Sequence, residues 1–69
     1  MKRYEYVETN CGIVRLLKLG TGYTSKGEVA TWCKVKESDC SYFVALDSRN
    51  RWLESSDADP RDDYDFIPV

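Results

Sequence analysis

The sequence contains no histidine among its 69 residues. Histidine is the commonest general base in enzymes and the usual partner of a nucleophilic cysteine, so the commonest catalytic arrangements are excluded. Paired carboxylates that hydrolyse glycosides need a cleft, and a chain of this length barely allows one. We therefore expect a protein that is not an enzyme and that uses no cofactor.

The sequence has only three cysteines, Cys11, Cys33 and Cys40, and lacks a Cys-x-x-Cys motif. An odd number of cysteines does not form a disulfide framework, which indicates reduced thiols in a cytoplasmic protein. We expect Cys33 to be a small apolar residue of the core rather than a reactive thiol.

No metal site is predicted, because a structural zinc ion requires four cysteine or histidine ligands. The aspartates near the C-terminus resemble calcium ligands in type, but the glycine and the final glutamate of an EF-hand loop are missing. These aspartates are Asp57, Asp59, Asp62, Asp63 and Asp65.

Long apolar runs are absent, and the longest ones present are far too short to span a membrane. The first three residues, Met1, Lys2 and Arg3, are followed by a Tyr-Glu-Tyr sequence instead of an apolar segment. This pattern predicts no signal peptide, and we expect the protein to act in the cytoplasm without contacting a membrane.

Residues 28–36 form the clearest strand pattern, with strand-favouring valine, threonine and tryptophan and no glycine or proline. Alternation places Val29, Thr31, Cys33 and Val35 on the face that we expect to be buried. The opposite face carries Ala30, Trp32, Lys34 and Lys36.

Four further strands are expected at 2–9, 13–19, 40–46 and 51–54, with turn residues at 10–12, 20–27, 37–39 and 47–50. This order predicts an all-β domain, a five-stranded antiparallel meander or small barrel of SH3-like or OB-like size. The alternative is an α+β fold with a short helix at 12–19, which Asn10 would cap and Gly20 would end.

The charge is unevenly distributed along the chain. Residues 1–53 carry nine lysines and arginines against six acidic residues, whereas residues 54–69 carry one arginine against six acidic residues. We therefore divide the chain into a β domain at 1–54 and an acidic tail at 55–69, partly docked or flexible.

The tail motivates the leading functional hypothesis. Its last part interleaves carboxylates with large rings in Asp62, Asp63, Tyr64, Asp65 and Phe66, a pattern that suits a basic, partly apolar groove on a larger protein partner. In its small size, its lack of a catalytic set and its acidic end, the chain is similar in style to small phage-encoded or bacterial accessory proteins, inhibitors among them. The alternative is that Phe66 and Ile67 fold back onto the domain.

A second hypothesis places single-stranded nucleic acid on a sheet face formed by Trp32, Lys34, Lys36 and Trp52. Small β-barrels stack bases on aromatic rings and hold phosphates with cations. The alternative is that Trp32 points inward and anchors the core, with the lysine side chains lying along the edge. Exposed strand edges also allow a homodimer.

Overall fold

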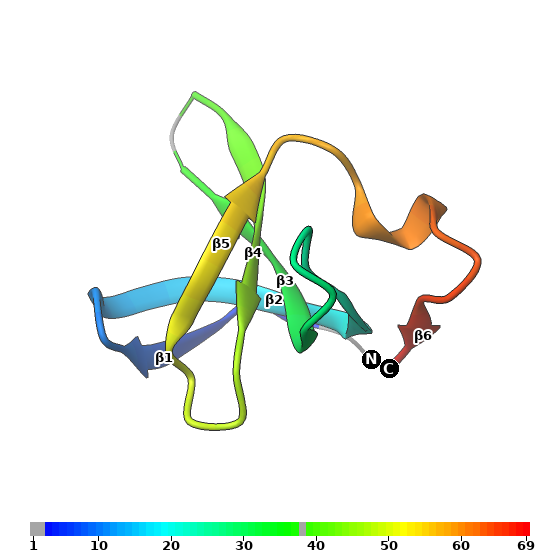
Figure 1. The fold of residues 1–69 in the computed structure, drawn as a ribbon. Helices are drawn as coiled ribbons and strands as arrows, with labels where there is room; N and C mark the ends of the chain where they lie inside the picture. Colours follow the sequence, from blue (N-terminus) through cyan, green and yellow to red (C-terminus); the bar gives the residue numbers. More distant parts are fainter. Residues whose placement is uncertain (1–2, 38) are drawn as a thin grey trace.

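The computed structural model describes residues 3–37 and 39–69 and shows a nearly all-β protein (Figure 1). Its elements are β1 (Glu5–Thr9), β2 (Gly12–Tyr23), β3 (Val29–Lys36), β4 (Ser41–Leu46), β5 (Trp52–Ser56), the 3-10 helix η1 (Pro60–Asp62) and β6 (Ile67–Pro68). The sheet follows the chain in the order β1-β2-β3-β4-β5, all antiparallel, and β6 pairs with β2. The predicted five-stranded antiparallel meander is therefore confirmed.

The alternative of a helix at 12–19 is wrong, because this segment belongs to β2. A tight turn decides its structure. Thr9 pairs with Gly12, the Thr9 hydroxyl donates to the Gly12 carbonyl at 2.8 Å, and the same hydroxyl accepts from the amide of Cys11 at 3.1 Å. Lys2 of the predicted first strand and Ser38 of the predicted turn at 37–39 lie outside the described residues.

β2 is longer than the sequence pattern predicts, since it continues through Gly20 and Gly22 to Tyr23. The predicted loop at 20–27 is accordingly reduced to a short turn. In this turn the Thr24 amide donates to the Glu28 carbonyl at 2.8 Å, and Gly27 adopts a positive φ of 80°. β5 likewise extends two residues past the expected boundary at 54, to Ser56.

The sheet bends because the ladders contain irregularities between Lys18 and Gly20 and between Ala45 and Leu46. Such bulges increase local twist and allow a meander to fold over on itself. As a result both faces of the sheet carry apolar clusters. The first cluster contains Val7, Leu16, Cys33, Val35, Val44 and Leu46, and the second contains Leu19, Ala30, Trp32, Phe43 and Ala45.

The expectation of a single buried face on the central strand is therefore wrong. Cys33 and Val35 are buried in the first cluster, but Ala30 and Trp32 of the other face are buried in the second, and Val29 is exposed. Simple alternation assumes a flat sheet with one solvated side, whereas here the second face is covered by the chain's own tail.

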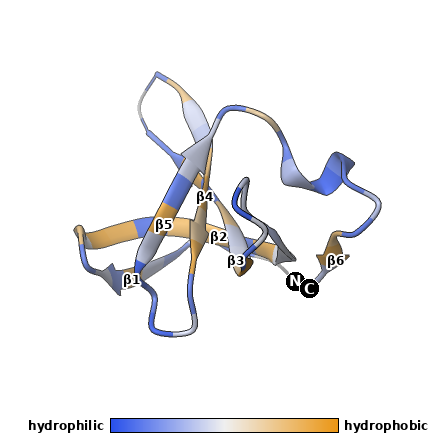
Figure 2. Ribbon diagram, viewed as in Figure 1, coloured by the Kyte–Doolittle hydropathy of each residue, from blue (hydrophilic) through white to orange (hydrophobic). Residues whose placement is uncertain are grey.

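The tail docks on the second cluster. Figure 1 shows it leaving β5, passing through η1 and returning to β2 as β6. Phe66 packs against the second cluster, and the amide of Val69 donates to the Leu19 carbonyl at 3.0 Å. Figure 2 shows the same division in hydropathy, with a hydrophilic η1 and a hydrophobic β6.

Candidate functional site

Four residues of the tail form an exposed turn between two anchored segments. This acidic loop consists of Asp62, Asp63, Tyr64 and Asp65, all of them exposed, and Tyr64 is 98% exposed. On its N-terminal side Pro60 is buried within η1, and on its C-terminal side Phe66 packs on the domain. The amide of Phe66 also donates to the Asp63 carbonyl at 3.1 Å, which closes the turn.

The tail's single arginine is already paired within the tail. Arg61 Nε donates to Asp59 Oδ1 at 2.9 Å, and its terminal nitrogen lies 2.7 Å from Asp59 Oδ2. These hydrogen bonds lower the pKa of Asp59, and the charge of Lys34 lowers it further. Because Asp59 takes up the arginine charge, the acidic loop keeps a net negative charge.

A groove of about 370 Å³ lies beside the acidic loop, between the tail and the turn that joins β2 to β3. Its lining combines rings with carboxylates, which is the combination that accommodates a lysine or arginine side chain. The rings and carboxylates of this lining belong to Tyr23, Trp32, Glu54, Asp59, Asp62 and Asp63. Glu54 accepts hydrogen bonds from the amide and the hydroxyl of Ser25, so its carboxylate is held in place.

Phe66 does not belong to the exposed part of the tail, although the sequence grouped it with the partner-binding residues. The Phe66 ring is half-buried against the second cluster, and it occupies the space that a side chain at Gly20 or Gly22 would need. The burial of its ring stabilises the docked tail, so we assign Phe66 to anchoring instead of to partner contact.

The structure does not bring Trp32, Lys34, Lys36 and Trp52 together on one surface. Trp32 is only 4% exposed, and its indole nitrogen donates to the Tyr23 carbonyl at 3.3 Å. Trp52 packs against the first cluster, on the other face of the sheet. The alternative given for Trp32 is therefore the one that the structure has, since its side chain points inward and anchors the core. No base can stack on this ring while the tail is docked.

Trp52 has neighbours of its own on the first face. Its ring lies 6.4 Å from that of Tyr42 at a tilt of 48°, and its amide donates to Asn10 Oδ1 at 2.7 Å. This hydrogen bond links the start of β5 to the turn between β1 and β2. We assign Trp52 to packing, together with Tyr42, because it shares no face with Lys36.

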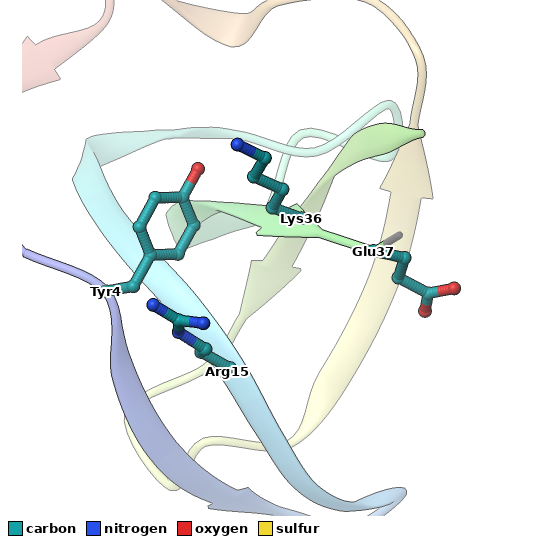
Figure 3. A pocket seen from close by; sticks show the side chains of 4 residues that line it. All are labelled: Tyr4, Arg15, Lys36 and Glu37. Atoms are coloured by element: carbon teal, nitrogen blue, oxygen red, sulfur yellow. The ribbon is translucent and has the colours of Figure 1, made fainter. Parts of the chain in front are cut away.

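A different group of rings and cations does gather, at the other end of the second face. Figure 3 shows Tyr4, Arg15 and Lys36 around a shallow pocket of about 350 Å³, with the carboxylate of Glu37 directed away from them. The Arg15 guanidinium carbon lies 5.6 Å from the centre of the Tyr4 ring, within the range of a cation–π contact.

This group was not predicted from the sequence, although a signal for it was present. A hairpin that turns at Asn10 and Cys11 pairs Tyr6 with Arg15, as the structure shows. Directly opposite residues share a face, so the turn position alone would have joined Tyr6 of β1 to the arginine of β2, with Tyr4 two residues before it.

The three cysteines are unpaired and differ in accessibility. Cys11 and Cys40 are exposed, whereas Cys33 is buried, and burial raises the pKa of the Cys33 thiol to about 11. A raised pKa keeps the thiol protonated at neutral pH, and only the thiolate is nucleophilic. Cys33 is thus unsuited to catalysis.

Alkylation should separate the three thiols. With iodoacetamide at pH 8 we expect two rapid additions, at Cys11 and Cys40, and a third at Cys33 only after urea unfolds the protein. Intact mass followed by peptide mapping measures this order. Alkylation of Cys33 in the native protein at the rate of Cys11 would contradict its assignment to the core.

Across residues 3–37 and 39–69 no three cysteine, aspartate or glutamate side chains are arranged to hold a metal ion. Within the same residues no helix is long and apolar enough to cross a membrane. No protein-family model matches this chain, and comparisons with curated proteins and with solved structures give no match either.

Proposed function

We propose that this protein is a non-enzymatic interaction module that binds a larger protein through the acidic loop. The observation that carries the proposal is the position of Tyr64, 98% exposed among three carboxylates on a segment anchored at both ends. Burial of a large exposed ring under a partner surface stabilises the complex, because apolar area is removed from water. Tyrosine is among the residues that contribute most of the binding energy in interfaces.

Anchoring supports the proposal because it lowers the cost of binding. A disordered tail loses conformational entropy when it is captured, whereas this loop is ordered by Pro60, Phe66 and the β6 pairing before any partner arrives. The negative charges of Asp62, Asp63 and Asp65 would attract a basic partner surface and increase the association rate.

The groove beside the loop supports a definite partner chemistry. A lysine or arginine of the partner would enter between the ring of Tyr23 and the carboxylates of Asp62 and Asp63, while Tyr64 packs on apolar surface next to it. By occupying such a basic surface, this chain would inhibit its target in the manner of a small phage-type or bacterial accessory protein. The free thiols fit a cytoplasmic setting.

Substitution of Tyr64 by alanine is expected to weaken partner binding at least about thirtyfold, or about 2 kcal/mol, because this ring is the proposed anchor. The partner is first defined as the protein that the wild-type chain enriches over a triple variant with Asp62, Asp63 and Asp65 changed to asparagine. It is then purified and titrated by calorimetry against each variant.

Two further variants separate the groove from the rest of the surface. Tyr23→Thr removes an aromatic residue of the groove and should weaken binding. Glu8→Gln is the matched control, an exposed acidic residue of β1 that does not line the groove, and should leave binding within about twofold, since isolated surface charges contribute little. If the Tyr64 and aspartate variants capture the same proteins with unchanged affinity, the acidic loop is not the binding site.

A further inference from the structure

We infer that the face formed by Tyr4, Tyr6, Arg15 and Lys36, here called the tyrosine–cation face, binds single-stranded nucleic acid. This face is distinct from the acidic loop, and it shares only Lys36 with the face that the sequence predicted from Trp32, Lys34, Lys36 and Trp52. Its function does not depend on the proposed protein partner.

The rings have the spacing that successive unstacked bases require. Tyr4 and Tyr6 are two residues apart and share the face of Arg15, since Arg15 pairs directly with Tyr6 and lies over the ring of Tyr4. Residues two apart along an extended chain are separated by about 7 Å, which an extended single strand can match by placing one base on each ring. Tyr6 is 76% exposed, so its ring is open to a base.

The cations stand beside the rings. Leu16 pairs with Val35, and the next positions outward bring Arg15 and Lys36 to the same pocket as Tyr4. Figure 3 shows the Lys36 ammonium and the Tyr4 hydroxyl directed to the same side, and a phosphate placed there would have both groups as donors. A guanidinium stacked on a ring adds a second flat surface for a base while keeping its charge available to phosphate.

The chain's own tail leaves this face open. β6 pairs with β2 at Gly20 and Thr21, five residues beyond Arg15, which corresponds to about 17 Å along the strand. Glu8 shares this face with Tyr6 and reduces its positive charge, whereas the Glu37 carboxylate points away from the pocket and accepts a hydrogen bond from the Tyr42 hydroxyl at 3.3 Å. We therefore expect a short site with two phosphate contacts.

The choice of a single strand follows from the rings. Bases in a duplex are stacked on each other and cannot lie on protein rings, whereas unpaired bases can. An acidic peptide would use the same cations but would gain nothing from flat surfaces spaced for bases. Both alternatives are outcomes of the test below.

The test is a titration of the full chain into a fluorescently labelled deoxythymidine decamer, read as anisotropy at 20 mM salt. We expect saturable binding whose affinity falls with salt at a log–log slope of about −1.4, the value for two phosphate contacts on a single strand. Tyr6→Thr should weaken binding about tenfold through lost stacking, and Lys36→Gln about fivefold through a lost phosphate contact.

Matched controls distinguish this face from the rest of the surface. Lys26→Gln removes an exposed lysine of the β2–β3 turn and Tyr64→Ala removes an exposed tyrosine of the acidic loop, and neither should change the affinity by more than about twofold. Unchanged decamer binding in Tyr64→Ala also separates this inference from the proposed function. Thermal unfolding confirms that Tyr6→Thr, a substitution at an exposed strand position, remains folded.

Three results would overturn the inference. The first is no binding of the decamer at 20 mM salt. The second is equal binding of an abasic decamer or of polyglutamate, which would show a general anion surface without base stacking. The third is tighter binding of a duplex than of the single strand, because a duplex cannot use the rings of Tyr4 and Tyr6.

Discussion

Replacement of Trp32 by alanine is expected to remove a large part of the free energy of unfolding of this protein. The side chain is 4% exposed and belongs to the second cluster, together with Ala30 and Phe43, against which the tail residue Phe66 packs. Removing a buried tryptophan costs about 3–5 kcal/mol, and a domain of this length is stabilised by roughly 3–10 kcal/mol in total. Urea unfolding followed by circular dichroism measures the loss.

Two control variants test whether the stability lost in Trp32→Ala comes from the size of the ring and from its burial. Trp32→Phe keeps a large ring and should cost about 1–2 kcal/mol. Trp52→Ala removes a half-buried ring from the first cluster and should cost less than Trp32→Ala, because part of its surface is already in water. A Trp32→Ala variant as stable as the wild type would show that the second cluster and the docked tail are not formed in solution.

Substitution of Gly20 by alanine is expected to release the tail from the sheet. A methyl group at this position would overlap the Ile67 carbonyl oxygen and would approach Phe66 Cζ and Pro68 Cα to 2.8 Å. Backbone atoms on both sides leave little room for adjustment, so we expect a loss of about 2–4 kcal/mol or an undocked tail. Limited proteolysis within 57–69 and a red shift of Trp32 emission report the release.

Gly27→Ala is the matched control for this substitution. Gly27 has a φ of 80°, but no atom lies within 4 Å of the position that a Cβ would take, so alanine there meets only the backbone penalty of about 1–2 kcal/mol. The tail should stay protected in Gly27→Ala and become cleavable in Gly20→Ala. Equal protection in the two variants would contradict the close contact between β2 and β6.

The Gly20→Ala variant also bears on the proposed function. It leaves every residue of the acidic loop unchanged and removes only the anchoring of Phe66 and β6. If order in the loop lowers the cost of binding, this variant should bind the partner more weakly than the wild type while retaining the same salt dependence.

The sequence by itself determined the five strands of the meander and three of its turns, since both depend on neighbouring residues. The strands predicted at 28–36 and 40–46 match β3 and β4 within one residue, and turn residues at 10–12 end β1 where the structure ends it. The free cysteines and the burial of Cys33 followed from composition and alternation in the same way.

Only the tertiary structure decided which faces are buried and which side chains meet. The continuation of β2 through Gly20 depends on its pairing with β3 across the turn at 24–28. The packing of Phe66 on the cluster of Trp32 and the pairing of β6 with β2 arise from contacts between segments more than thirty residues apart, which no local pattern contains. The same is true of the separation of Trp52 from Lys36, because the ladder irregularity between Ala45 and Leu46 pairs Trp52 with Leu46 and so places it on the face of the first cluster. Alternation specifies two sides of a strand, but the side that faces water depends on what the rest of the chain covers.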